Sequence, residues 1–211
     1  MRIVAGACVV GYCVVWLLAK RFRMRGGWKI LPMVIGIVAV LFTGNEVRWA
    51  AFEGQLAGAA QPGMGGARAS FACERVLRGA WASQGRVGHV WFGPDGRPAG
   101  DAFLSMDTCS RIKAWRSDPA GASVEQIVAV HTVTHESAHL AGIRDEAAAE
   151  CSAVQRDTTT MTRLGATRAE AVKQVGEYLA LVYPRLPDAY RSDQCVSGGT
   201  LDQTPGDGTW P

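Results

Sequence analysis

The sequence predicts a mainly α-helical protein of the α+β class, in which one or two membrane segments precede a small helical domain with a short β-hairpin. The first 45 residues of the 211-residue chain are strongly apolar, whereas the rest has the composition of one water-soluble domain. Helical repeats behind capping residues and two β-like runs around a turn predict the domain's elements. We therefore divide the chain into a membrane anchor (1–45), a flexible linker (46–70) and an extracytoplasmic domain (71–211).

Two uncharged runs make up the anchor. Residues 3–19 and 30–45 span 17 and 16 positions, slightly fewer than the roughly 20 apolar residues of a spanning helix. Interfacial Trp and Lys side chains can extend both runs. Five positive residues separate the runs, namely Lys20, Arg21, Arg23, Arg25 and Lys29. Because positive loops stay in the cytoplasm, we expect a two-helix hairpin with the domain after residue 46 outside.

Two alternatives to the hairpin remain. The N-terminal segment can act as a cleaved signal peptide, although no clear small-x-small cleavage site precedes Arg48. Translation from Met24 would leave a single apolar run, which is a simple signal anchor. Both alternatives place the domain on the same side of the membrane.

Four of the six cysteines lie in the predicted domain, which fits an oxidising compartment. We favour the pairs Cys73–Cys109 and Cys151–Cys195, because each closes a loop within one half of the domain. Four buried free thiols are the alternative, and the lack of a Cys-x-x-Cys spacing argues against a cysteine zinc site. The net charge of +3 is too small to indicate a nucleic-acid partner.

The elements follow in order. Glycine and proline in residues 53–70 predict a flexible tether, and residues 71–83 predict a short helix that carries Cys73. Residues 89–92 and 102–106 predict two strands of a hairpin, joined through a Gly-Pro-Asp-Gly turn.

Three longer helices come next. The first starts at a Ser-x-x-Gln capping box and covers residues 123–141, with Gly142 as its stop. The second covers residues 145–161, and the third starts at a Thr-x-x-Glu capping box and covers 167–183. The tail, 185–211, is expected to be a loop that Cys195 holds in place.

The first of these helices carries the pattern His-Glu-x-x-His. His135 and His139 lie one turn apart on the same face, so their imidazoles can bind one zinc ion. Glu136 is placed to take a proton from a zinc-activated water and to pass it to a leaving amine. Three of the four histidines lie within residues 131–139. We therefore predict a Zn²⁺ site with Glu136 as the catalytic base; the alternative is an amphipathic helix with exposed histidines.

A catalytic zinc site needs a third protein ligand and leaves one position for water. Asp145, Glu146 and Glu150 compete for this role. We favour Glu146, because Glu146 and Glu150 share one helix face and would supply a ligand and a carboxylate that orients a histidine. Asp145 and Glu150 remain alternatives. Acids that do not bind the metal would instead place negative charge at the helix N-terminus, where the helix dipole favours it.

Several of these motifs resemble those of zincin metallopeptidases. The spacing from His135 to Asp145 resembles the extended motif of metzincins, particularly the aspartate variant of snapalysin-like enzymes. The segment 146–150 resembles the Glu-x-x-Ala-Asp element of membrane-bound gluzincins, in which the first acid binds zinc and the second supports a histidine. The spacing to these acids is shorter than in gluzincins, and no clear metzincin Met-turn follows.

The soluble region as a whole is similar to uncharacterised actinobacterial membrane-anchored zincin-like proteins. The segment 135–139, the pair Glu150-Cys151 and the tail 190–195 carry this resemblance. It implies a zincin-like domain and a zinc-dependent metallopeptidase that hydrolyses peptide or protein substrates outside the cytoplasmic membrane. It implies no particular substrate.

Other interpretations concern His131 and the metal. His131 lies one turn before His135, and we expect it to be a partly buried polar residue with a structural hydrogen bond. A hydrogen bond to a substrate oxyanion or to a ligand is the alternative. Tyr183 and Tyr190 can polarise a carbonyl, but the sequence does not place them.

A non-catalytic zincin-like binding module is the alternative function, and Glu136 argues against it. A closed structural zinc site would use cysteines and four protein ligands.

Overall fold

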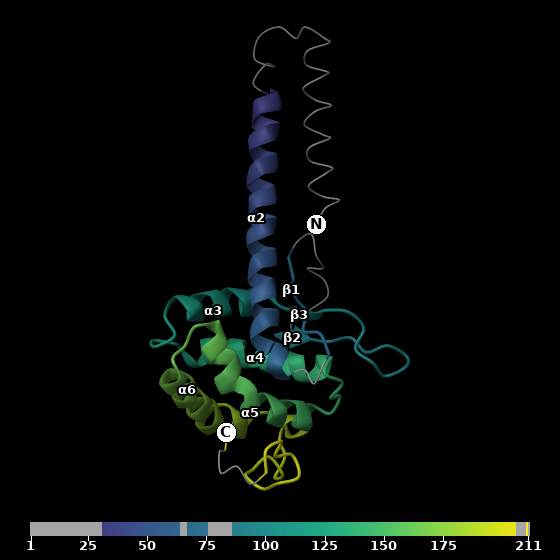
Figure 1. The fold of residues 1–211 in the computed structure, drawn as a ribbon, viewed down its shortest axis with the longest axis vertical. Coiled ribbons are helices and arrows are strands. Elements are labelled where there is room, and N and C mark those ends of the chain that lie inside the picture. Colours follow the sequence, from purple (N-terminus) through teal and green to yellow (C-terminus); the bar gives the residue numbers. More distant parts are fainter. Residues whose placement is uncertain (1–30, 64–66, 76–85, 206–209, 211) are drawn as a thin grey trace. The chain divides into compact units, whose positions relative to one another are not determined.

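The computed structural model describes residues 31–63, 67–75, 86–205 and 210 (Figure 1). This described part is mainly helical, with five α-helices and a small three-stranded sheet. The α-helices are α2 (Leu31–Ala60), α3 (Met106–Ser117), α4 (Val124–Leu140), α5 (Glu146–Leu164) and α6 (Arg168–Leu181). The strands are β1 (Phe71–Cys73), β2 (Gly88–His89) and β3 (Ala102–Leu104). The chain forms two compact units, residues 1–52 and 53–211.

Helix α2 begins in the first unit and is long and apolar enough to cross a membrane, by length and composition. The stretch Val34–Ala60 has a mean hydropathy of 1.3. The large apolar side chains between Val34 and Val47 are mostly exposed, and the exposed fractions of Val40 and Leu41 reach 72% and 68%. An exposed apolar helix surface of this kind is suited to contact with lipid. The predicted segment 3–19 and the positive loop lie outside the described residues, so the two-helix hairpin stays a prediction.

The flexible linker expected at residues 46–70 differs from the structure, because residues 46–60 continue α2 as helix. In the second unit, Leu56 is fully buried and Ala59 nearly so. The Glu53 carboxylate accepts a hydrogen bond from the Cys73 backbone N–H at 3.0 Å. These tertiary contacts outweigh the low helix propensity of the glycines in this segment, which is about 1 kcal/mol each.

The sheet has the strand order β1-β3-β2. Strands β2 and β3 pair antiparallel, as in the predicted hairpin, and Gly93 N–H donates to the Arg97 carbonyl at 2.8 Å in the turn between them. Strand β1 pairs parallel with β3. The helix predicted for residues 71–83 is therefore wrong at 71–73, and residues 76–85 lie outside the described part. All three β1 residues are buried, so pairing with β3 decides their conformation rather than local pattern.

The predicted caps of α4 and α6 are present as capping boxes at Ser123 and Thr167. Helix α3 was not predicted, although Ser105 caps it and Cys109, Ile112 and Trp115 are buried at a spacing of three residues. The short helices η3 (Tyr183–Arg185) and η4 (Asp188–Tyr190) interrupt the loop expected in the tail.

Helix α4 lies at the centre of the second unit, in contact with α3, α5 and α6 (Figure 1). The fully or almost fully buried core side chains of these helices are Ile112, Trp115, Ile127, Val130, Val133, Val154, Met161 and Val175. Both predicted disulfides, Cys73–Cys109 and Cys151–Cys195, are present. The first links β1 to α3, and the second links α5 to the tail.

Candidate metal centre

The turn between α4 and α5 brings the polar residues of the two helices together. Helix α4 ends in a reversal in which Gly142 has φ +98°, a conformation that side-chain-bearing residues rarely adopt. Ile143 N–H donates to the Ala138 carbonyl at 3.1 Å in this reversal. The Ile143 carbonyl in turn accepts a hydrogen bond from His139 Nδ1 at 2.6 Å. The predicted stop at Gly142 therefore also orients a histidine of the site.

His135, His139 and Glu146 lie together in the structure. The two Nε2 atoms are 3.0 Å apart, and Glu146 Oε2 lies 3.1 Å from His135 Nε2 and 3.2 Å from His139 Nε2. Both histidines are buried, whereas 40% of the Glu146 side chain is exposed. This group can therefore hold a metal ion at a point open to solvent beside Glu146.

The hydrogen bonds of the two imidazoles test whether a metal fits. A carbonyl oxygen only accepts, so His139 Nδ1 must carry the hydrogen that Ile143 receives. His135 Nδ1 in the same way donates to the Glu150 carboxylate at 3.0 Å. In the neutral rings both Nε2 atoms are then bare lone pairs that face one another and the Glu146 oxygen. A cation between these three atoms removes their repulsion.

The distances also suit the geometry of zinc. With bonds of about 2.0–2.1 Å in a tetrahedral site, two ligand atoms lie about 3.3 Å apart. The three separations in this group are 3.0, 3.1 and 3.2 Å. Without a metal, a proton takes its place: burial acts to lower the pKa of His135, but hydrogen bonds to Glu146 and Glu150 outweigh it and raise the pKa to about 9. Hydrogen bonds to the two histidines lower the pKa of Glu146 to about 2.

The other two candidate acids have different roles in the structure. The Asp145 carboxylate accepts the Ala148 N–H at 2.8 Å as the N-cap of α5, so it serves the helix rather than the histidines. Glu150 is buried behind His135 and receives its Nδ1 hydrogen. A carboxylate in this position fixes the tautomer and the ring orientation of a ligating histidine.

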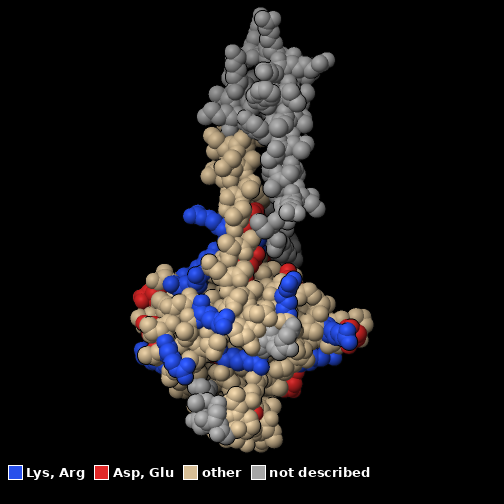
Figure 2. Space-filling view, in the orientation of Figure 1, with Lys and Arg blue, Asp and Glu red and all other residues tan. Residues whose placement is uncertain are grey.

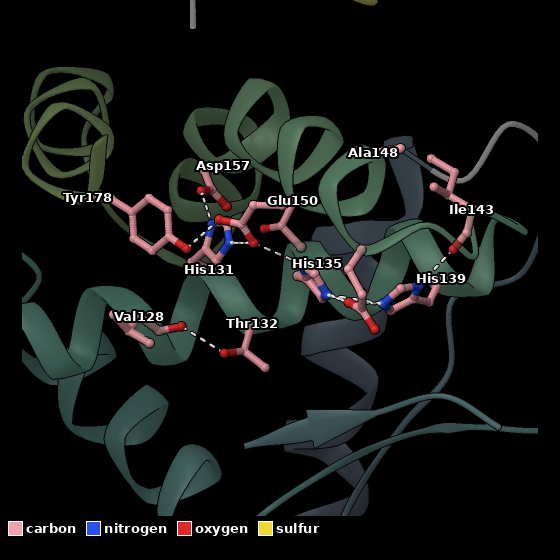
Figure 3. A network of polar contacts seen from close by, with 12 residues as sticks. Val128, His131, Thr132, His135, His139, Ile143, Ala148, Glu150, Asp157 and Tyr178 are labelled. Carbon is pink, nitrogen blue, oxygen red and sulfur yellow. Dashed lines mark hydrogen bonds and ion pairs between the residues drawn. The ribbon is translucent and has the colours of Figure 1, made fainter. Parts of the chain in front are cut away.

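Glu150 belongs to a buried polar network that extends away from the candidate ligands (Figure 3). His131 Nε2 lies 3.0 Å from Glu150 Oε2, and His131 Nδ1 lies 2.6 Å from Asp157 Oδ2. Tyr178 of α6 donates its hydroxyl to Glu150 Oε1 and stacks on the His131 ring with 4.0 Å between centroids. His131, Glu150 and Asp157 are all at most 3% exposed. His131 thus has the buried structural role that the sequence favoured.

The two carboxylates of this network favour a positive charge on His131. Burial acts to lower the pKa of His131, but Asp157 and Glu150 outweigh it and raise the pKa to about 10. Burial acts to raise the pKa of Glu150. The nearby His131 and the hydrogen bonds that Glu150 accepts outweigh burial and hold the pKa of Glu150 well below the ordinary value. An imidazolium between two carboxylates follows. His131, His135 and Glu150 also lie close enough to hold an ion, but each of these ring nitrogens already donates a hydrogen.

Glu136 is buried beside the candidate ligands, with 4% exposure. Its Oε2 atom has no hydrogen-bond partner within the described part of the chain. Burial raises the pKa of Glu136 to about 7, against the opposing effect of the two nearby histidines. Gly88 of β2 packs against this carboxylate so closely that an added Cβ would lie 2.7 Å from Glu136 Oε1. The site therefore holds a carboxyl group that can both accept and donate a proton near neutral pH.

Sequence reasoning missed several residues around the group. One is Phe92, whose ring meets the His139 ring edge-on at 6.0 Å. Tyr190 was named from the sequence but not placed, and its ring lies 5.9 Å from that of His135. Tyr178 and Asp157 were also missed, although Asp157 and Glu150 are seven residues apart on α5 and so share a face. That spacing was the one available signal, because the tyrosines arrive from distant parts of the chain.

Comparisons with protein-family models, with curated proteins and with solved structures gave no match for this chain.

Proposed function

We propose that this protein is a membrane-anchored, zinc-dependent metallopeptidase of the zincin type, which hydrolyses peptide bonds outside the cytoplasm. One observation carries the proposal. His135 and His139 both commit their Nδ1 hydrogens to fixed acceptors, so their Nε2 lone pairs converge with the Glu146 carboxylate. Beside them lies the buried Glu136, whose Oε2 has no hydrogen-bond partner among the described residues.

The donor set favours zinc. Two imidazole nitrogens and one carboxylate oxygen are the ligands of many catalytic zinc sites, and they leave a fourth position for water. Glu146 has the most exposed side chain of the three, which leaves that position accessible from solvent. A bound zinc ion would supply a Lewis acid that polarises a carbonyl and acidifies water.

The protein's own groups would handle the protons. Glu136, with a pKa near neutrality, is suited to accept a proton from the attacking water and to deliver it to the leaving amine. Glu150 would keep the His135 ring in its ligating tautomer, and the Ile143 carbonyl would do the same for His139. Gly88 leaves no free space on one side of Glu136, so the carboxylate has few orientations available.

The location rests on two features. Helix α2 is apolar and long enough to span a membrane, and the two disulfides of the second unit fit an oxidising compartment. We therefore place this unit on the extracytoplasmic side. An alkaline phosphatase reporter fused after residue 46 should be active, and an inactive reporter would contradict this orientation.

A non-catalytic zincin-like binding module is the second candidate. It would explain the metal ligands but gives no reason for burying a carboxylate whose Oε2 has no hydrogen-bond partner in the described part of the chain, which costs free energy. The acid at Glu136 therefore favours the enzyme.

The decisive experiment compares the wild type, Glu136→Gln and the matched control Glu125→Gln, which alters an exposed carboxylate on the same helix. Metal content and hydrolysis of a mixed peptide pool are measured for each. We expect about one zinc ion per chain in all three proteins. Activity should fall by about 10²–10⁴-fold in Glu136→Gln alone, which is the usual contribution of a general base.

Each other result has a definite meaning. Equal turnover by the wild type and Glu136→Gln would exclude Glu136 from the mechanism. Zinc binding without turnover of any peptide by the wild type would favour the binding module. Absence of metal from the wild type after zinc loading would overturn the site itself.

A further inference from the structure

A small polar pocket lies between α4, α5 and the end of α2, within the second unit. Its volume is about 130 Å³, and Thr134, Ser137, Arg156, Thr159 and Thr160 line it together with residues 59–62. One water molecule needs only about 10–15 Å³ by the same measure, so the pocket has room for a larger polar group. Thr134 and Ser137 lie on the face of α4 turned away from His135 and His139, because helical residues advance by about 100° each. The pocket is thus distinct from the candidate metal centre.

Arg156 is unusual among the basic residues of this unit. Figure 2 shows many Lys and Arg side chains that reach into solvent on the face drawn. Arg156 Nη1, in contrast, is buried and has no hydrogen-bond partner in the described part of the chain. No described carboxylate forms an ion pair with its guanidinium, and burial lowers the pKa of Arg156. The Arg156 side chain is half-buried, and its Nη1 atom is buried without a partner, which is costly. This end of the guanidinium is therefore expected to meet a ligand that the described residues do not supply.

A second polar atom in the same pocket also lacks a partner. Thr134 is 1% exposed, and its Oγ1 has no hydrogen-bond partner among the described residues. A buried hydroxyl is normally satisfied. Thr134 comes from α4 and Arg156 from α5, so two donors on different helices line one small pocket.

We propose that this pocket binds a small oxyanion such as phosphate or sulfate, held by the Arg156 guanidinium and the Thr134 hydroxyl. The planar guanidinium donates hydrogen bonds in a fixed fork that matches oxyanions, and such charge-assisted bonds are strong. A metal ion does not fit the pocket, because the one charged group lining it is a cation. The bound anion would join α4, α5 and the end of α2, and so stabilise the second unit.

The test uses the full-length, metal-free protein in nanodiscs of neutral phosphatidylcholine. Thermal unfolding is followed while phosphate or sulfate is titrated against chloride at constant ionic strength. We expect the oxyanions to raise Tm saturably and chloride to have no comparable effect. Arg156→Gln should weaken phosphate binding about tenfold or more, the loss expected for a charge-assisted hydrogen bond.

Two further variants keep the test decisive. Thr134→Val, which retains Arg156, should weaken binding less than Arg156→Gln, and it replaces that variant if the latter fails to fold. Arg168→Gln removes an exposed arginine at the start of α6 and should bind phosphate like the wild type. His135→Ala should also bind phosphate normally, which separates this site from the metal centre. Equal binding by the wild type, Arg156→Gln and Thr134→Val, or an equal effect of chloride, would overturn the proposal.

The phosphate group can come from solution or from a lipid headgroup. Nanodiscs that contain phosphatidic acid distinguish the two sources. If the headgroup is the ligand, these nanodiscs should raise Tm without added phosphate in the wild type but not in Arg156→Gln. If the ligand is free phosphate, the rise should require the dissolved anion in either lipid.

Discussion

The ring hydrogens of individual histidines determine what the candidate metal centre can do. His139 gives its Nδ1 hydrogen to the Ile143 carbonyl and His135 gives its own to Glu150. In its neutral form each ring therefore presents a lone pair from Nε2, which is the form that binds a metal. His131 has the opposite state, because carboxylates face both of its nitrogens and favour the doubly protonated ring.

The charge on His131 should make the free energy of unfolding of the metal-free protein depend on pH. The pKa of His131 is raised from 6.5 to about 10 in the folded state. Its charge therefore stabilises the fold fully below pH 6.5, and this contribution is lost as the pH rises through about 10. His131→Gln should lower the free energy of unfolding by about 3–5 kcal/mol near pH 6, the usual cost of removing one partner of a buried ion pair.

Urea unfolding of the metal-free protein in detergent at pH 6 and pH 10 measures this effect. The difference between the wild type and His131→Gln should shrink at the higher pH. Lys173→Gln, at an exposed position of α6, is the control for loss of one positive charge and should change stability by less than about 0.5 kcal/mol. A difference that does not change with pH would show that His131 is neutral in the fold.

At the scale of elements, helices α4 and α5 together supply the residues of the candidate metal centre. Helix α4 contributes the two histidines, α5 contributes Glu146 and Glu150, and the Gly142 reversal sets the two helices against each other. Helix α6 supports the pair through Tyr178, which donates to Glu150. Glu150 thereby links all three helices.

Glu150→Gln tests this link. Glutamine has one oxygen to replace the two that accept from His131, His135 and Tyr178, so the His135 ring loses part of its support. We expect zinc affinity to fall by about 10–100-fold, as for other carboxylates that orient a ligating histidine. Competition with a chromophoric chelator measures the affinity. Glu177→Gln, on the outer part of α6, is the control; an unchanged affinity in Glu150→Gln would contradict the orienting role.

Much of the element pattern could be predicted because its signals are local. Both capping boxes, the helical spacing of the apolar residues and the stop at Gly142 depend on residues a few positions apart. Strand β1 could not be predicted, because its partner β3 lies about thirty residues away and sets its conformation by pairing and burial. The helical state of residues 53–60 depends in the same way on long-range contacts within the second unit, namely the burial of Leu56 and the hydrogen bond from Cys73 to Glu53.

At the scale of the whole molecule, the chain joins an apolar helix to a disulfide-linked unit. The exposed apolar side chains of α2 include Val38, Val40 and Leu41, each more than half exposed. Such a surface is suited to lipid, whereas the core of the second unit is closed by packing and by two disulfides. The described part thus contains one segment suited to lipid and one unit suited to water.

Replacing Val40 and Leu41 by lysine tests the membrane role of α2. The experiment uses a chain that begins at Met24, so that one long apolar run remains. Each lysine near the centre of a spanning helix costs roughly 2.5–3.5 kcal/mol, so insertion should fail. Carbonate extraction should release this variant but retain the matched double alanine variant. Retention of the lysine variant would mean that α2 does not anchor the protein by spanning the bilayer.

The sequence by itself determined the features that depend on near neighbours along the chain. These are the apolar N-terminal run, the capped helices and the placing of His135 and His139 on one face. It also ranked the cysteine pairs correctly, because short loops within each half close most readily.

Only the tertiary structure decided which role each of the three acids after His139 has. Asp145 caps α5, Glu146 reaches both Nε2 atoms and Glu150 turns inward to His131 and His135. All three follow α4 closely, and sequence spacing cannot distinguish them. Their roles depend on the angle at which α5 packs against α4 after Gly142, and that angle is set by the buried side chains of the whole unit.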